Sequence, residues 1–351
     1  DKLVGENLTR QPYDENYLIS FVCDEDQKKV RDFLNSFPSI NDSLSASIEF
    51  TSKKSKKCIS ARRIFFKDNN GKFIEKLISV EDITQIKKKS EELEYYAYYD
   101  VLTSLYNRNH FFTVLRDLLE KASKENTSVE LMLVDIDNFK KINDSLGLVY
   151  GDELVQSLAL FIKSLSTDKI KVGRYGSDVF AIAIFDPCGK NCSDMIFKTI
   201  RDRVKKPFIL TNKAEVTISV SAGVCEYPGC GHDALELIKN AEIVLYASKQ
   251  HEKGSISYFS DEILKVYQEE IVLENKLNDA ILNNELSVYF QPQYDANTGS
   301  LRGAEALIRW LDENENVVYR PLDFIPLAEK NGTIIEIGNF VFREVFKSIH
   351  E

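Results

Sequence analysis

The sequence predicts a multidomain protein that combines α/β and α+β parts, and three observations support this class. At 351 residues with 43% hydrophobic content, the chain is long enough for two or three packed globular domains. Residues 46–80 contain strand-like runs, whereas residues 129–185 alternate between strand and helix patterns. A charged helical stretch at 83–100 lies between these two parts. The pattern therefore predicts a small β-rich part, a helical linker and a larger mixed domain.

The β-rich part begins with a short predicted helix. The acidic triplet Asp24-Glu25-Asp26 precedes apolar residues at helical spacing, and Pro38 follows them, which is typical of a capped helix ending before the proline. Strand-like runs follow at 46–51, 58–67 and 72–80. The segment 68–71 joins the last two runs and ends in Asn-Gly, which favours a β-hairpin.

The stretch 83–100 is predicted to be helical. Its residues Ile83, Ile86, Ser90, Leu93 and Ala97 lie near a three-and-four spacing, which is typical of one face of a helix. Two arrangements fit this spacing equally well. One is a short parallel coiled coil between two protomers, and the other is a single connecting helix packed on the next domain.

The mixed domain is predicted around an acidic strand end. The apolar run 129–134 indicates a buried strand that ends at Asp135, and a helix follows Gly151, with Asp152 complementing its start. Residues 170–173 and 179–185 read as a hairpin joined by a turn that contains Asp178. If this hairpin pairs beside the first strand, Asp135 and Asp178 meet at one sheet edge. Two carboxylates beside water and phosphate oxygens suit Mg²⁺, so this edge is a place to hold a triphosphate.

Five ordered motifs of this region carry a family resemblance. They are 100–108 (DVLTSLYNR), 135–144 (DIDNFKKIND), 174–180 (RYGSDVF), 219–224 (SVSAGV) and 241–249 (AEIVLYASK). Together they resemble the GGDEF domain of diguanylate cyclases over about residues 95–259. The resemblance implies a ferredoxin-like nucleotide-cyclase palm that binds GTP with Mg²⁺ or Mn²⁺. It also implies that two such protomers face each other to make cyclic di-GMP.

The family motif is altered in this chain. Where the family has Gly-Gly-Asp/Glu-Glu-Phe, residues 176–180 are Gly-Ser-Asp-Val-Phe. Ser177 is expected to crowd or re-angle the turn that approaches the phosphates. Val179 replaces an acid that helps to hold metal and to activate the attacking hydroxyl, and a valine can do neither. The inhibitory Arg-x-x-Asp site of the family would span 167–170 and is absent from the sequence.

The resemblance assigns roles to the residues that remain. It implies metal ligands at Asp135 and Asp178, and a GTP site formed by Phe139, Lys140, Asn143, Asp152, Lys249 and Lys253. Within this site Asn143 and Asp152 match the pair that reads guanine, and the two C-terminal lysines match phosphate-binding cations. One extra residue between those lysines, relative to the family, makes the position of Lys253 less regular.

Two further resemblances flank this domain. The segment 80–84, which leads into the charged helix, resembles the end of a PAS sensor domain whose ligand is unknown. Near the C-terminus, residues 275–283 read as a helix and 286–291 as a strand, and the motifs 291–293 (QPQ), 305–310 (EALIRW) and 324–329 (FIPLAE) follow in order. Together they resemble the opening of an EAL phosphodiesterase domain. In the EAL family the residue matching Glu305 binds the catalytic metal, and those matching Gln291 and Arg309 contact cyclic di-GMP. Such domains are TIM-like barrels of about 250 residues, so only the truncated start of a barrel is expected here. The predicted boundaries are 1–82 for a partial PAS-like sensor, 83–99 for the linker, 100–260 for GGDEF and 261–351 for EAL.

Composition narrows the partners and the location. The net charge of −10 argues against non-specific nucleic-acid binding, and the chain contains no apolar run near the roughly 20 residues that span a bilayer. A cytoplasmic location is expected, and a membrane-anchored parent protein is left open.

The pairs Cys188/Cys192 and Cys225/Cys230 are expected to be ordinary reduced thiols, with a structural zinc or a reversible disulfide as alternatives.

Three functions fit the sequence. The first is a degenerate GGDEF domain that binds GTP and Mg²⁺ and regulates a downstream EAL phosphodiesterase. The second is a residually active diguanylate cyclase, and the third is a catalytically silent dimerisation scaffold. A homodimer through the PAS-like segment and the linker, with GTP and cyclic di-GMP as ligands, is expected for the first. Val179 favours the regulatory module and the scaffold over an active cyclase. The regulatory module is favoured over the scaffold by the retained polar residues, which are Asp135, Asn143, Asp152, Asp178 and Lys249.

Overall fold

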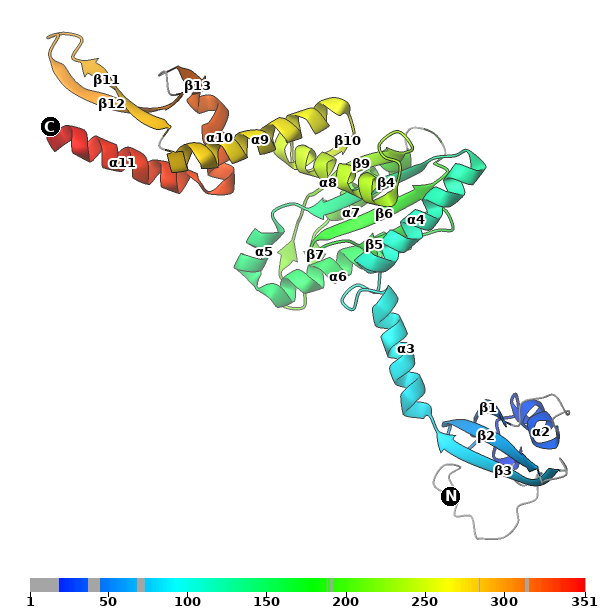
Figure 1. The fold of residues 1–351 in the computed structure, drawn as a ribbon. Helices are drawn as coiled ribbons and strands as arrows, with labels where there is room; N and C mark the ends of the chain where they lie inside the picture. Colours follow the sequence, from blue (N-terminus) through cyan, green and yellow to red (C-terminus); the bar gives the residue numbers. More distant parts are fainter. Residues whose placement is uncertain are drawn as a thin grey trace. The chain divides into compact units, whose positions relative to one another are not determined.

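The computed structural model describes residues 19–36, 45–67, 73–187, 189, 192–283, 285–312 and 316–350. The chain divides into two compact units, Asp1–Val101 and Leu102–Glu351, and Figure 1 colours it from blue to red along the sequence. The elements, in order, are α2 (Gln27–Asn35), β1 (Ser45–Thr51), β2 (Cys58–Lys67), β3 (Phe73–Asp82), α3 (Thr84–Tyr98), α4 (Arg108–Glu125), β4 (Val129–Ile136), α5 (Phe139–Leu146), α6 (Leu148–Ser164), β5 (Ile170–Arg174), β6 (Val179–Phe185), α7 (Cys192–Val204), β7 (Phe208–Ile209), β8 (Glu215–Val216), β9 (Val220–Tyr227), α8 (Ala234–His251), β10 (Ile256–Tyr258), α9 (Asp261–Asn283), β11 (Leu286–Tyr294), β12 (Leu301–Leu311), β13 (Val317–Tyr319), α10 (Pro321–Asn331) and α11 (Ile334–His350).

The first unit is a small α+β fold. Strands β1, β2 and β3 form an antiparallel sheet in that order, and α2 packs its apolar side on it through Val30, Phe33 and Leu34. The predicted helix and the three predicted strands are confirmed to within two residues at their ends, whereas the 68–71 connection lies outside the described residues. Asp26 is the N-cap residue of α2, yet its carboxylate accepts the Thr51 N–H at 2.8 Å and makes no helix cap.

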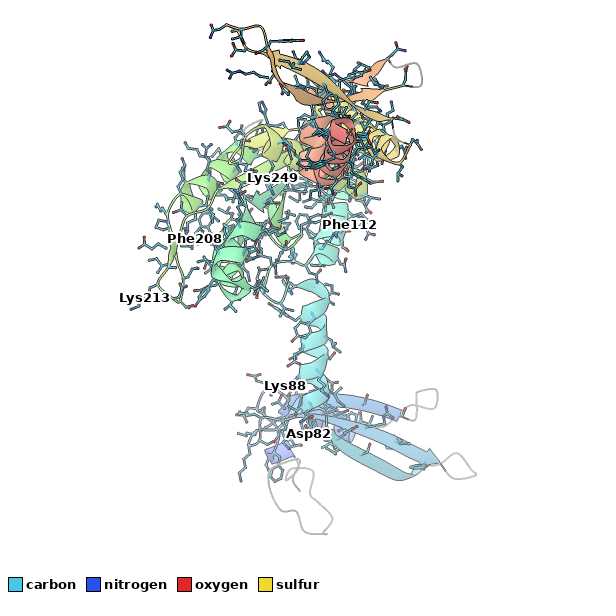
Figure 2. The ribbon with its side chains drawn as sticks, turned by 90° about the vertical axis from the view of Figure 1, so that its left-hand side faces the viewer. Asp82, Lys88, Phe112, Phe208, Lys213 and Lys249 are labelled. Carbon is cyan, nitrogen blue, oxygen red and sulfur yellow. The ribbon has the colours of Figure 1, made fainter. Side chains whose placement is uncertain are left out.

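The predicted linker helix is confirmed as α3. It begins at Thr84, whose N–H and hydroxyl both donate to Asp82 Oδ1, at 3.0 and 2.5 Å; Figure 2 labels Asp82 at the foot of this helix. No side chain of α3 is buried, and Ile86 and Leu93 are 61% and 68% exposed. The coiled coil therefore stays a prediction.

The second unit contains a five-stranded sheet in the order β10-β9-β4-β6-β5. The predicted β5–β6 hairpin is confirmed, and it pairs beside the predicted strand β4. Strand β4 is central and runs antiparallel to both β6 and β9. At its carboxyl end, Asp135 lies opposite Val179 on one side and Ser221 on the other.

Helices cover both faces of this sheet (Figure 1). Alternate residues of β4 pack on α6 and α7 on one face, and on α4 and α8 on the other. Gly223 of β9 lets α8 approach closely, because a Cβ there would lie 2.3 Å from the Leu245 backbone nitrogen. This close contact holds the C-terminal end of α8 next to the carboxyl end of β4.

The predicted start of the helix after β4 was wrong. Gly147, with φ +94°, separates α5 from α6, so α6 begins at Leu148. Asp152 therefore lies in the second turn of α6, where it is exposed, and does not complement the helix start.

The C-terminal part continues with α9, which is longer than the helix predicted at 275–283 and packs along α8. An open sheet in the order β11-β12-β13 follows, and its small core includes Leu277, Trp310 and Phe324. The described strands of this part do not close into a barrel. Across the described part of the chain, every helix is too short or too polar to cross a bilayer.

Candidate functional site

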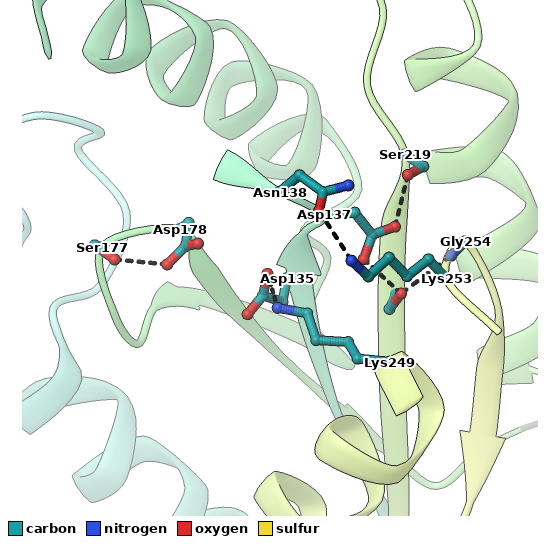
Figure 3. Close-up of polar contacts among 10 residues, drawn as sticks. Asp135, Asp137, Asn138, Ser177, Asp178, Ser219, Lys249, Lys253 and Gly254 are labelled. Carbon is teal, nitrogen blue, oxygen red and sulfur yellow. Dashed lines mark hydrogen bonds and ion pairs between the residues drawn. The ribbon is translucent and has the colours of Figure 1, made fainter. Parts of the chain in front are cut away.

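The acidic end of β4 is built around Asp135, which is 8% exposed. The Lys249 ammonium, from the end of α8, lies 2.6 Å from Asp135 Oδ1 and forms an ion pair with it (Figure 3). Burial raises the pKa of Asp135 to about 6, against the lowering effect of Lys249 and with a further rise from the charges of Asp178 and Asp137. The strand end therefore holds a carboxylate that a cation stabilises.

A second buried carboxylate, Asp137, lies one pleat further along and was missed as a site residue by the sequence reasoning. The hydroxyls of Ser219 and Ser221 each donate to it at 2.7 Å, and the Gly254 N–H donates to Ser221 Oγ at 3.1 Å. This network ties the start of β9 and the loop after α8 to the end of β4 (Figure 3). The alternation of Asp135 and Asp137 was the available signal, because residues two apart share a face.

The turn between β5 and β6 places Asp178 at the same edge. The Ile136 N–H donates to the Asp178 carbonyl oxygen at 3.2 Å, and Arg174 donates to the carbonyl oxygens of Gly176 and Ser177 at 3.1 and 2.7 Å. The Ser177 hydroxyl donates to Asp178 Oδ1 at 2.5 Å. Ser177 thus occupies one oxygen of the predicted metal ligand, an interaction that a glycine could not make.

Val179 adds only hydrocarbon to this edge. It is the direct strand partner of Asp135, so the two side chains lie on one face, and it packs at the margin of the core formed with α4 and α8. Its Cβ is within 3.4 Å of where a Cβ on Gly176 would lie. The position that carries an acid in the resembling family is therefore filled with an apolar contact.

Both predicted lysines reach the site. Lys253, which follows α8, donates to Asn138 Oδ1 at 2.9 Å, beside the start of α5 (Figure 3). Together with Lys249 it places two ammonium groups along an edge that carries three carboxylates. The extra residue between the two lysines does not remove Lys253 from this edge.

Asn143 of α5, which is predicted to read the guanine base, packs against Gly151 of α6. Asn143 Oδ1 is buried and has no hydrogen-bond partner among the described residues. Gly151 provides the room, because a Cβ there would lie 1.8 Å from this oxygen. A buried acceptor without a donor costs free energy, so it fits an N–H group of a ligand such as a purine base.

The other predicted nucleotide contacts lie around this oxygen. Phe139 is nearly buried at the start of α5, and its ring lies 3.3 Å from the place that a Cβ on Gly151 would occupy. Lys140 and Asp152 are exposed, on α5 and α6 respectively. Their side chains are accessible to a ligand at this end of the sheet.

The carboxylates at this edge are the candidate metal ligands of the site. Among the described residues, no three or more His, Cys, Asp or Glu side chains are grouped to hold an ion. Asp135 and Asp178 would therefore share a hard cation with phosphate oxygens and water, which suits Mg²⁺. The donor set and the orphaned Asn143 oxygen together fit a magnesium-bound purine nucleotide.

The three predicted EAL-type residues lie on the β11–β12 hairpin. Gln291 and Glu305 are direct strand partners, and Arg309 lies four residues further along β12, so all three belong to one face. Gln291 and Glu305 are exposed, whereas Arg309 donates to the Ile308 carbonyl oxygen at 2.7 Å. The hairpin therefore carries one carboxylate and two further polar side chains on one face.

The sheet, its covering helices and the acidic end of its central strand define a nucleotide-cyclase type of domain. Residues 97–255 match the family model described as diguanylate cyclase, GGDEF domain, and residues 274–351 match that described as EAL domain. The chain is thus a member of the GGDEF–EAL class, with a GGDEF domain followed by EAL sequence. The PAS resemblance of the first unit stays a prediction.

Curated proteins are similar to about three quarters of this chain. The chain is 34% identical over 267 residues to the signaling protein YkoW of Bacillus subtilis, covering 76% of this chain and 33% of that protein. It is 30% identical over 270 residues to the cyclic di-GMP phosphodiesterase PdeR of Escherichia coli, covering 76% of this chain and 40% of that protein. The chain therefore spans well under half the length of these relatives.

Solved structures of GGDEF domains are also similar. The GGDEF domain of TpbB (YfiN) from Pseudomonas aeruginosa is 27% identical, with a TM-score of 0.47 over 49% of this chain and 99% of that one. The GGDEF domain of DgcB from Caulobacter crescentus, in complex with c-di-GMP, is 27% identical, with a TM-score of 0.43 over 46% of this chain and 93% of that one.

Proposed function

We propose that the GGDEF domain binds GTP with Mg²⁺ without condensing it, and that this binding regulates EAL phosphodiesterase activity against cyclic di-GMP. The observation that carries this proposal is the site edge itself. Asp135 and Asp178 lie at one sheet edge and the buried Asn143 oxygen has no partner among the described residues, which supports nucleotide binding. Val179 contributes a packing contact where the resembling family has an acid, which supports the loss of turnover. Binding groups are thus kept and a catalytic group is lost.

Each retained residue has a distinct part in binding. Asp135 and Asp178 would hold the cation, which neutralises the triphosphate charge when bound. Lys249 and Lys253 would contact phosphate oxygens, and Asn143 would accept a hydrogen bond from the guanine edge, with Asp152 nearby. Val179 cannot accept a proton from an attacking hydroxyl, so the general-base step of condensation has no side chain at this position.

A route to the EAL part follows from α8. Tyr246, one turn before Lys249, donates to Glu270 Oε2 of α9 at 3.2 Å. Lys330 of α10 pairs with Glu270 Oε1 at 2.7 Å and lies 4.3 Å from the centre of the Tyr246 ring. The helix that carries a predicted phosphate contact therefore also contacts the first helix after the β11–β13 sheet.

We also propose the domain boundaries 1–82, 83–99, 100–260 and 261–351, with a partial PAS-like sensor first. A homodimer through this sensor and α3 is supported by the exposure of α3, since none of its 15 residues is buried and most helical stability in proteins comes from packing. The helical linker would then transmit a signal between paired protomers.

The competing function, residual diguanylate cyclase activity, is tested by product formation. The protein is incubated with GTP and either Mg²⁺ or Mn²⁺, and the products are separated by chromatography. We expect no cyclic di-GMP above a control without protein, a trace with Val179→Glu, and substantially more with Ser177→Gly and Val179→Glu combined. Multiple turnovers by the unchanged protein would overturn the proposal. Equal rates for Val179→Glu alone and the double variant would show that Ser177 has no part in the loss.

A further inference from the structure

Two cysteines meet at the end of β9, away from the nucleotide edge. Cys225 is 1% exposed and packs in the core between β4, α4 and α8, whereas Cys230 is half-buried. Between them the chain makes one tight turn, closed by the Cys230 N–H donating to the Glu226 carbonyl oxygen at 2.8 Å. This turn returns Cys230 to the strand end that Cys225 occupies.

The Cys230 sulfur lies close to the backbone of Cys225. Cys230 Sγ accepts the Glu226 N–H at 3.2 Å. Because that nitrogen is two bonds from the Cys225 Cα, the sulfur lies at most about 6 Å from this Cα. Rotation about the Cα–Cβ bonds can then bring the sulfurs to bonding distance, as in ordinary disulfides.

The environments of the two thiols differ. The hydrogen bond from Cys225, helped by the Glu226 N–H, lowers the pKa of Cys230 to about 7 against the effect of burial. The same hydrogen bond and burial raise the pKa of Cys225 far above its usual range. Cys230 is therefore the thiolate that reacts first, and Cys225 is the buried thiol beside it.

We propose that Cys230 and Cys225 form a thiol–disulfide exchange site, which takes a small disulfide as its oxidant and closes into an intramolecular disulfide. The Cys230 thiolate attacks one sulfur of the external disulfide, which forms a mixed disulfide and releases one small thiolate. Cys225 then loses its proton and attacks Cys230 Sγ, which releases the second small thiol. In sum, the protein dithiol loses two electrons and two protons, and the small disulfide becomes two thiols.

The site is placed to affect α8. Asn240 of α8 donates through Nδ2 to the Cys230 carbonyl oxygen at 2.7 Å, and the cap of α8, Asp233, follows three residues after Cys230. A disulfide would fix the turn that precedes the helix carrying Tyr246 and Lys249. The inference is independent of nucleotide binding, and its test needs no nucleotide.

The experiment maps the disulfide directly. The folded protein is incubated with glutathione disulfide, free thiols are blocked with N-ethylmaleimide, and a tryptic digest is analysed by mass spectrometry. Both cysteines fall in one peptide, 214–239. We expect this peptide to lose two hydrogens and to carry no maleimide, while Cys58, a half-buried thiol of the first unit, keeps its label. Two maleimide labels, or a glutathione that persists on Cys230, would overturn the proposal.

Single variants separate attack from resolution. In Cys225→Ala, the mixed disulfide on Cys230 should accumulate, because no second cysteine is present to resolve it. At neutral pH this mixed disulfide should form more slowly than in the unchanged protein, because Cys230 loses the partner that lowers its pKa. In Cys230→Ala, Cys225 should stay unmodified because it is buried. The rate of the unchanged protein should be half-maximal near pH 7. Prompt modification of Cys225 in Cys230→Ala would contradict the assigned order, and the mapping of the unchanged protein decides the proposal even if a variant does not fold.

Discussion

At Asp135, burial and the Lys249 charge act in opposite directions on the carboxyl group, and burial has the larger effect. A pKa raised to about 6 means that the folded protein binds a proton more readily than the unfolded chain. The contribution of Asp135 to stability is therefore largest below about pH 4 and is lost as the pH rises through 6. The proposed metal-binding role would account for a carboxylate at a position where ionisation costs stability.

Asp135→Asn should consequently raise the free energy of unfolding at pH 7 while it weakens nucleotide binding. The expected gain is on the order of 1 kcal/mol, since the ionised form no longer has to be buried, although Lys249 loses its partner. The gain should shrink as the pH falls from 7 to 5. Urea unfolding at both pH values measures it, and a variant less stable than the unchanged protein at pH 7 would show that the Lys249 ion pair outweighs burial.

In the proposed nucleotide site, Asn143 is the residue expected to select the base. Asn143→Ala should reduce the preference for GTP over ATP by about 1 to 3 kcal/mol, because the guanine edge then faces no acceptor in a buried place. Competition binding with both nucleotides measures this difference. Gln156→Ala, which changes an exposed residue of α6, is the matched control. An unchanged preference would mean that the orphaned oxygen has no ligand.

At the scale of elements, α8 is the part that links the two predicted functions. Gly223 lets it lie directly on β9, Lys249 at its end meets Asp135, and Tyr246 meets Glu270 and Lys330. Helices that pack this closely move as units, because interiors are dense and deform little. A displacement of Lys249 would therefore also displace α10.

Lys330→Met should break this link while it keeps the aliphatic stem of the side chain. In the unchanged protein we expect GTP to alter amide hydrogen exchange in α10 (Pro321–Asn331), and in the variant this response should be lost, with binding itself retained. Lys347→Met removes an exposed lysine of α11 that pairs with Glu344, and it serves as the control. An equal response in Lys330→Met and the control would mean that the signal does not pass through Lys330.

For the whole molecule, apolar spacing and turn residues in the sequence predicted those features that depend on short segments of the chain. The buried run of β4, the β5–β6 hairpin and the meeting of Asp135 and Asp178 followed from strand length, turn residues and pairing. The start of α6 was misplaced because a positive φ at Gly147 is not visible in apolar spacing. These differences lie at element ends, where hydrogen bonds of a few residues decide the outcome.

The contacts that sequence reasoning did not find are those made by tertiary packing. The Tyr246–Glu270–Lys330 cluster joins three helices from distant parts of the chain. The Ser177–Asp178 hydrogen bond and the approach of Cys230 to Cys225 depend on side-chain rotamers within short turns. Residue spacing does not specify such rotamers, so these features are apparent only in the folded structure.

The most direct test of the central claim is a calorimetric titration of the protein with GTP in the presence of Mg²⁺. We predict saturable binding of one GTP per chain that depends on Mg²⁺, is weaker for ATP and is abolished by Asp178→Ala. Asp178→Ala removes one of two carboxylates that face the cation, so the triphosphate charge stays uncompensated. If the folded protein shows no saturable heat with GTP and Mg²⁺, the site is vestigial, and the scaffold function replaces the regulatory one.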